Sequence, residues 1–213
     1  MQETDRLFAG SIPEIYDRYL APLIFAPYAR DLADRVAAHP AVSVLETAAG
    51  TGVATRALVR ALPAGTRITA TDLNQPMLDF AAARPGAANV VWRQAYALML
   101  PFGDGTFDAV VGQCGAMFFR DKVAAYREAR RMLRPGGRFF LNVWDRIEHS
   151  ELALLVTEAV ASLFPADPPR FLARTPHGYF DTGRIRNELR AAGFAEITIE
   201  TVELSSRAPS PRH

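Results

Sequence analysis

Cysteine is almost absent from this chain of 213 residues, which contains only Cys114. A single cysteine excludes a disulfide within the chain and a metal site built from several thiolates. Excess charge is also missing, because 24 basic and 23 acidic residues leave a formal net charge of +1. Nucleic-acid-binding domains usually carry a strongly basic surface. We therefore expect no nucleic-acid partner.

Long hydrophobic runs are missing as well. No stretch reaches the roughly 18 consecutive apolar residues that a membrane-spanning helix needs, and residues 1–6 are too polar for a signal peptide. We therefore expect a cytoplasmic protein without an integral membrane segment. With 49% hydrophobic residues, the chain can still bury a sizeable core as one domain.

Short apolar runs alternate with longer amphipathic ones in the middle of the chain. The expected strands are Ala41–Thr47, Arg67–Thr71, Val90–Arg93, Phe107–Gln113 and Gly137–Trp144, and the expected helices between them are Gly52–Leu62, Gln75–Ala83 and Lys122–Leu133. This alternation predicts an α/β fold, a Rossmann-like, doubly wound and mostly parallel sheet with helices on both faces. Ligands of such sheets bind at the carboxyl ends of the strands, beside the first strand.

We expect residues 1–213 to form a single domain with two additions to this core. Residues 1–40 are helical in pattern and rich in aromatic residues, so they predict a helical cap over the ligand end, followed by the cofactor-binding core at 41–147. Residues 148–180 are long for a connection and predict a lid insertion after the fifth strand. Residues 181–213 are expected to add a C-terminal helix and strand.

A glycine-containing turn, V-L-E-T-A-A-G-T-G at residues 44–52, follows the first strand. It is not a dinucleotide fingerprint, because Thr55 stands where the third glycine should be, and no Gly-Lys-Ser/Thr of a P-loop follows. Glu46 would repel a pyrophosphate but attract a ligand with positive charge. The two glycines let backbone approach a ligand closely, and Asp72, at the end of the second strand, can accept both ribose hydroxyls. The pattern therefore predicts a nucleoside with a cationic tail.

Four stretches together resemble the class I S-adenosylmethionine-dependent methyltransferases. They read VLETAAGTG, ATDLNQPML, LPFGDGTFDAVVGQCGAMFF and EARRMLRPGGRFFLNVW, and the resemblance covers nearly the whole chain. Within that class, the chain is similar to the small-molecule enzymes of the ubiquinone/menaquinone-biosynthesis C-methyltransferase type. The resemblance implies S-adenosylmethionine as cofactor and methyl transfer to a small acceptor, aromatic or phenolic/quinol-like.

The resemblance also implies which residues bind the cofactor. They are Glu46, Ala48, Gly50, Gly52, Asp72, Leu73, Met77, Ala95, Tyr96 and Gln113. Tyr96 departs from the family pattern, because the stretch that commonly reads Q-A-D-A is Q-A-Y-A here. A phenol then stands in place of the acid that would accept from the adenine amino group.

On the acceptor side, we expect contacts from aromatic and sulfur-containing residues of the cap, the fourth-strand loop and the insertion: Tyr16, Tyr19, Met117 and Tyr179. A sulfonium carries an excellent leaving group, so methyl transfer needs chiefly alignment of the acceptor and exclusion of water. No metal is expected. His149, His177 and Tyr179 are candidates for a general base, and the sequence does not choose among them.

Other interpretations remain open at this point. A non-catalytic nucleoside-binding module would need the same turn, and a nucleotide-dependent oxidoreductase is disfavoured by Thr55 and Glu46. The stretch D-P-P-R at 167–170 resembles a motif of amino-directed DNA methyltransferases but lacks its aromatic residue.

The C-terminal stretch raises the question of oligomeric state. Residues 196–207 predict one strand where the family usually ends in a hairpin of two. The chain is then either truncated, or it receives a strand from a partner as a homo-oligomer.

Overall fold

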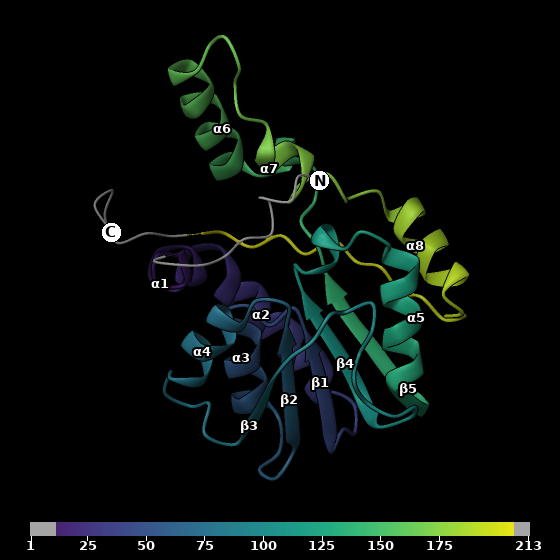
Figure 1. Ribbon diagram of the computed structural model, residues 1–213. Helices are drawn as coiled ribbons and strands as arrows, with labels where there is room; N and C mark the ends of the chain where they lie inside the picture. Colours follow the sequence, from purple (N-terminus) through teal and green to yellow (C-terminus); the bar gives the residue numbers. More distant parts are fainter. Residues whose placement is uncertain (1–11, 207–213) are drawn as a thin grey trace.

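Five parallel strands form the centre of the protein, whose computed structural model describes residues 12–206. The strands are β1 (Ser43–Thr47), β2 (Arg67–Asp72), β3 (Val90–Gln94), β4 (Phe107–Gln113) and β5 (Leu133–Asn142). Their order across the sheet is β3-β2-β1-β4-β5 (Figure 1). The chain therefore crosses from β1 to one side through β2 and β3, and to the other through β4 and β5. This confirms the predicted doubly wound, parallel α/β sheet.

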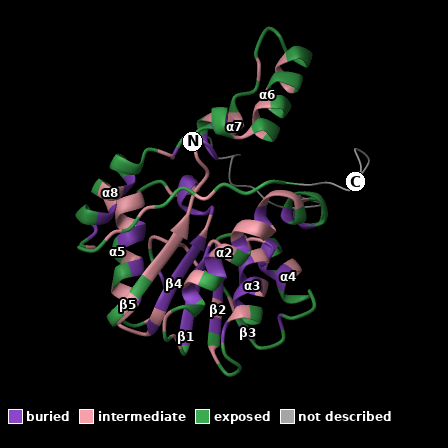
Figure 2. Cartoon of the chain, turned by 180° about the vertical axis from the view of Figure 1, so that it is seen from behind, coloured by how far each residue is buried: buried purple, intermediate pink, exposed green. Residues whose placement is uncertain are grey.

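The central strand β1 is buried along its whole length. Val44 packs into a cluster with α2 (Ala26–Ala37) and α3 (Val53–Ala61), whereas Leu45 packs into a cluster with α5 (Lys122–Met132). Successive side chains of a strand point to opposite faces, so these helices cover the two faces of the sheet. Figure 2 shows β1, β2 and β4 as largely buried between helices whose outer faces are exposed.

Two further helices complete the layers around the sheet. Helix α4 (Gln75–Ala82) contacts β2 and β3, and α8 (Thr182–Ala191) packs beside α5. The fifth strand begins at Leu133, four residues before the expected start at Gly137. Leu133 pairs with Phe107, and the register shifts before the next pair, so a bulge brings the R-P-G-G turn into the strand.

The N-terminal region is helical from residue 12 and changes its helix type along the way. It comprises α1 (Ile12–Ile15), the π-helix η2 (Tyr16–Phe25) and then α2. Pro22 lies inside η2 and has no amide hydrogen to donate to a regular α-helical ladder. Residues 1–11 of the expected cap lie outside the described part of the chain.

An insert lies between β5 and α8. It contains the short helix η4 (Ile147–His149), α6 (Glu151–Leu163) and α7 (Phe171–Arg174). Helix α6 has no buried residue and stands away from the body of the protein (Figures 1 and 2). Within the described range, no helix combines the length and the apolar character needed to cross a membrane.

The expected C-terminal strand does not form over the described residues 194–206, so that prediction is wrong there. This segment is held by side chains in place of a strand ladder. Arg186 Nη1 donates to the carbonyl of Ile197 at 2.7 Å, and Glu200 forms an ion pair with Arg35 of α2 at 2.7 Å. Ile197 and Ile199 pack against the cluster beside β5. Arg207, the last residue of the expected strand, lies outside the described residues.

Candidate active site

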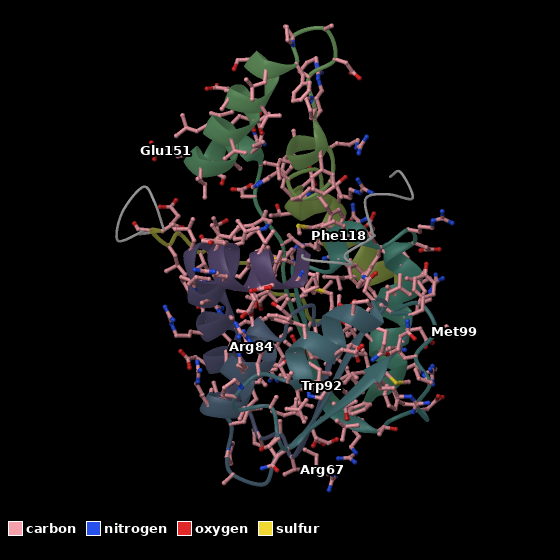
Figure 3. The ribbon with its side chains drawn as sticks, turned by 60° about the vertical axis from the view of Figure 1, so that its left-hand side comes forward. Arg67, Arg84, Trp92, Met99, Phe118 and Glu151 are labelled. Atoms are coloured by element: carbon pink, nitrogen blue, oxygen red, sulfur yellow. The ribbon has the colours of Figure 1, made fainter. Side chains whose placement is uncertain are left out.

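The turn after β1 contains two glycines that serve different purposes. Both have left-handed backbone, with φ of +54° at Gly50 and +78° at Gly52. A β-carbon at position 52 would lie 2.9 Å from the ring of Trp92 and 3.1 Å from the β-carbon of Ala81; Figure 3 labels Trp92 on β3. A β-carbon at position 50 would meet nothing within 4 Å. Protein packing therefore explains Gly52, and Gly50 faces open space at the end of the sheet.

The loops after β1 and β4 touch at this point. Ala48 and Cys114, which follow the two strands, both have φ of +54°, a conformation that non-glycine residues rarely adopt. A β-carbon at position 115 would lie only 2.5 Å from that of Ala48. Gly115 is therefore required by the side chain of Ala48, which stands at a predicted cofactor-binding position.

Glu46 is buried beneath the glycine turn, with 1% of its surface exposed. Burial raises the pKa of its carboxyl group from 4.5 to about 8, although the hydroxyl of Thr55 donates to Oε2 at 2.5 Å and opposes that rise. The group is thus largely protonated at neutral pH, and a nearby cationic ligand would favour its ionised form. The sequence interpretation used Thr55 only as a missing glycine. The hydroxyl of Thr55, in the first turn of α3, was the feature of the sequence that could have indicated its hydrogen bond to Glu46.

Asp72 bridges the loops that follow β1 and β2. Its Oδ2 accepts from the amide of Gly50 at 2.9 Å, and its Oδ1 accepts from the amide of Asn74 at 2.8 Å. A carboxylate has about four acceptor sites, so Asp72 retains capacity for a ligand. The predicted ribose contact is compatible with this bridge and remains a prediction.

The third loop of this edge, after β3, is tied to the second. The amide of Ala95 donates to the carbonyl of Asp72 at 2.9 Å, and Gln94 Nε2 donates to the carbonyl of Leu73 at 2.8 Å. Tyr96 follows directly and is half-buried. The predicted adenine-side residues of both loops are thus brought together, with Met77 buried on α4 and Leu73 exposed.

The cap closes the other side of the site. Gln113 Nε2, at the end of β4, donates to the carbonyl of Phe25 at 2.9 Å. Its Oε1 is buried without a hydrogen-bond partner among residues 12–206, and so is Oγ1 of Thr51 in the glycine turn. Burial raises the pKa of Tyr16 well above its ordinary value, and the charges of Cys114 and Asp72 raise it further. The unpaired Oε1 of Gln113 and Oγ1 of Thr51 are buried polar atoms of the kind that is expected where a polar ligand binds.

An ion-pair cluster fastens the cap to the core. Asp17 of η2 is buried and accepts from Arg56 of α3 at 2.7 Å and from Arg84, which follows α4. Burial acts to raise the pKa of Asp17, but hydrogen bonds from Arg84 and Arg56 outweigh it and hold that pKa below its ordinary value. Arg56 also donates to the carbonyl of Thr51 at 2.7 Å. Figure 3 shows Arg84 beneath the N-terminal helices.

The remaining predicted residues do not all converge on this site. Tyr19 is 45% exposed and stacks under the guanidinium of Arg18, away from the buried cluster that contains Tyr16. Met117 is buried in that cluster together with Tyr179. The hydroxyl of Tyr179 forms a hydrogen bond with the hydroxyl of Tyr126 at 3.0 Å and donates to Oε2 of Glu188 on α8 at 2.5 Å.

The two histidines of the insert differ in their surroundings. His149 is exposed, and its Nδ1 lies 2.8 Å from Oδ2 of Asp145. His177 is buried, and its Nδ1 lies 2.7 Å from the backbone carbonyl of Asp145. A carbonyl can only accept, so Nδ1 of His177 carries the hydrogen and the lone pair of the neutral ring is on Nε2. Among the described residues, no three His, Cys, Asp or Glu side chains are grouped so that they could hold a metal ion.

Substituting Gly115 by Ala should destabilise the protein by about 1–3 kcal/mol, because the new methyl group overlaps that of Ala48. Position 115 has ordinary right-handed backbone, so alanine itself is compatible there. The double variant Ala48→Gly/Gly115→Ala should recover most of the loss. Urea unfolding of the single and double variants measures this coupling, and strictly additive losses would contradict it.

Glu46 should make the ligand-free protein less stable as pH rises between about 4.5 and 8. In that window the folded state keeps a proton that the unfolded state has lost, so the unfolding free energy falls by up to about 1.4 kcal/mol per pH unit. Glu46→Gln should remove this part of the slope, whereas Glu158→Gln on exposed α6 should not. Urea unfolding at several pH values measures both; identical slopes in wild type and Glu46→Gln would contradict the assignment.

Comparison with known proteins places this geometry in a family. The family described as "Methyltransferase domain" matches residues 45–141. The ubiquinone/menaquinone biosynthesis C-methyltransferase of Saccharophagus degradans is 30% identical over 166 residues, which are 72% of this chain and 67% of that protein. Nocamycin O-methyltransferase of Saccharothrix syringae is 31% identical over 200 residues, 87% of this chain and 71% of that protein.

A solved structure agrees with the fold. A Methanococcus maripaludis protein assigned to the S-adenosyl-L-methionine-dependent methyltransferases superposes with a TM-score of 0.68, at 20% identity, over 99% of both chains. These findings confirm the resemblance stated from the motifs. The chain therefore belongs to the class I S-adenosylmethionine-dependent methyltransferases and uses S-adenosylmethionine as its cofactor.

Proposed function

We propose that the protein transfers the methyl group of S-adenosylmethionine to a small, ring-bearing acceptor. The observation that carries this proposal is a continuous series of ring contacts beside the cofactor loops. Tyr16 stacks on Phe25 at 4.9 Å between centroids, Phe25 meets Trp144 at 5.7 Å, and Tyr28 meets Trp144 edge-on at 5.1 Å. Trp144 then stacks on His177 at 6.1 Å. The cap, the loop after β5 and the insert thus contribute to one aromatic surface, which suits a flat apolar molecule.

The buried polar groups suit the cofactor. Gly50 would let the ligand approach the backbone, Asp72 would accept from the ribose hydroxyls, and the unpaired Oε1 of Gln113 would accept from the ammonium group of the methionine portion. The bound cofactor supplies a methyl group on a positively charged sulfur. The protein must then orient the acceptor and exclude water around that sulfur. The curated relatives are named as C- and O-methyltransferases, so their names support a small acceptor without choosing the atom that is methylated.

His177 is the best candidate for the residue that takes the acceptor's proton. Its Nδ1–H bond to Asp145 leaves Nε2 as the basic atom, and its ring joins the aromatic surface. Tyr179 is a weaker candidate, because burial first, and then Tyr126 and Glu188, raise the pKa of its hydroxyl far above the ordinary value. His149 is exposed and already paired with a carboxylate.

Calorimetric titration and turnover test the proposed function together. S-adenosylmethionine and S-adenosylhomocysteine should bind the wild-type protein while NAD does not, and Asp72→Ala should weaken cofactor binding. A panel of phenols, catechols and hydroquinones should then yield methylated products detectable by mass spectrometry. Cofactor binding without turnover of any ring-bearing acceptor would contradict the proposed substrate class.

His177→Gln should lower kcat on a phenolic acceptor by about 10²–10⁴-fold, the usual range for loss of a general base. Binding of S-adenosylhomocysteine should change little. His149→Gln is the matched control and should retain kcat within about threefold. Equal kcat values in the two variants would show that His177 is structural.

A further inference from the structure

One arginine joins the cap to the glycine turn. Arg56 of α3 donates from Nη2 to Oδ1 of Asp17 at 2.7 Å and from Nη1 to the carbonyl of Thr51 at 2.7 Å. Asp17 belongs to η2 of the cap, and Thr51 lies between the two glycines of the turn. A single planar guanidinium thus holds the two segments at a fixed separation.

The groups of this link are withdrawn from water. Asp17 and Thr51 are buried, and the side chain of Arg56 is only 18% exposed. Removing one partner of a buried ion pair is costly, because the other charge stays buried and unpaired. The carbonyl of Thr51 would likewise lose a charged donor. The position of the cap and the position of Thr51 therefore depend on each other.

The glycine turn needs support from outside itself. Three of its residues have positive φ, among them Ala48, for which this backbone is strained and is maintained only by surrounding contacts. The amide of Gly50 is held by Asp72 at 2.9 Å. The carbonyl of Thr51, the next residue, is held by Arg56. The first contact comes from the end of β2, and the second connects the turn to the cap.

Arg56 also acts on the carboxyl group beneath the turn. Burial raises the pKa of Glu46, whereas the hydroxyl of Thr55 and the positive charge of Arg56 act to lower it. The guanidinium is therefore close enough to Glu46 to favour its ionised form. One side chain is thus shared by the cap, the turn and a predicted cofactor-binding residue.

Arg84 provides a comparison within the same cluster, because it binds the same carboxylate without reaching the turn. Its guanidinium donates to Oδ2 of Asp17, from Nε at 3.1 Å and also from Nη2, and it lies over the ring of Phe80 at 4.9 Å. Among the residues that the structure describes, the side chain of Arg84 donates to Asp17 alone. The two arginines therefore separate fastening of the cap from contact with the turn.

The cap end of the link lies beside the proposed acceptor surface. Tyr16, which precedes Asp17, is the first ring of that surface and stacks on Phe25. The carbonyl of Phe25 accepts from Gln113, a predicted cofactor-binding residue at the end of β4. Docking of the cap thus places the rings of the acceptor surface, and the same docking holds the turn through Arg56.

We propose that Arg56 is a positioning residue that couples docking of the cap to binding of S-adenosylmethionine. With the cap docked, Asp17 holds Arg56, and Arg56 holds the turn in the conformation that receives the cofactor. A bound cofactor in turn stabilises the docked cap, because coupling between two sites is reciprocal. The inference rests on the proposed function, which places the cofactor on the turn and the acceptor against the cap.

Calorimetric titration of S-adenosylhomocysteine into the full chain gives the first measurement. Arg56→Gln should weaken binding by about tenfold, within the usual range of coupling between two sites. Arg84→Gln is the matched control: it also removes an ion pair of Asp17, yet it should bind within about threefold of wild type. Equal losses in the two variants would overturn the proposal, since both arginines would then only fasten the cap.

Hydrogen–deuterium exchange with and without saturating S-adenosylhomocysteine measures the coupling itself. In the wild type and in Arg84→Gln, the ligand should protect the amides of both the glycine turn and η2. In Arg56→Gln it should protect the turn alone, a difference that a general loss of stability would not produce. Asp17→Ala breaks the link from the cap side and should give the same pattern, so it decides the question if Arg56→Gln does not fold.

Ligand-induced protection of η2 that survives in Arg56→Gln or Asp17→Ala, or that is absent from the wild type, would overturn the proposal. Neither result affects the proposed function. That function fails separately if the wild-type protein does not bind S-adenosylhomocysteine or methylate any ring-bearing acceptor.

Discussion

Hydrogen bonds from two backbone amides to the Asp72 carboxylate hold together the end of the sheet where we expect the cofactor to bind. One oxygen bonds to the amide of Gly50 and the other to the amide of Asn74, so the loops after β1 and β2 cannot move independently. The backbone carbonyl of the same residue accepts from Ala95 and adds the loop after β3. One residue thereby positions three of the loops that face the ligand. Such preorganisation matters because methyl transfer depends on alignment.

Two other buried carboxylates surround this bridge, and their environments push their pKa values in opposite directions. Asp17 has two arginine partners, so its pKa is lowered and it carries a fixed negative charge between the cap and the core. The Glu46 carboxyl accepts hydrogen bonds from the hydroxyl and the backbone of Thr55, but these do not outweigh burial, so its pKa rises to about 8. The site can thus respond to a cationic cofactor, because the arrival of positive charge favours ionisation of Glu46 without disturbing the clamp made by Asp17.

The sequence predicted the parts of the structure that depend on local pattern. The five strands and the helices between them follow from short apolar runs and turn residues, and the ligand end follows from the parallel order of the strands. It could not predict contacts between distant segments. Gly52 is required by Trp92, and Gly115 by Ala48, and no spacing rule relates these positions. The C-terminal residues had a strand-like pattern, yet the side chains of Arg35 and Arg186 hold them outside the sheet.

The same distinction separates the cofactor half of the site from the acceptor half. Most of the predicted cofactor-binding residues lie at strand ends, where the order of the sheet places them. The acceptor half that we propose is assembled from the cap, the loop after β5 and the insert, whose relative positions depend on tertiary packing such as the contact of Trp144 with both Phe25 and His177. Family motifs therefore identify the cofactor, whereas the aromatic contacts between the cap and the insert become visible only in the folded chain. The bridge formed by Asp72 joins the loops after β1, β2 and β3 and involves neither the cap nor the insert.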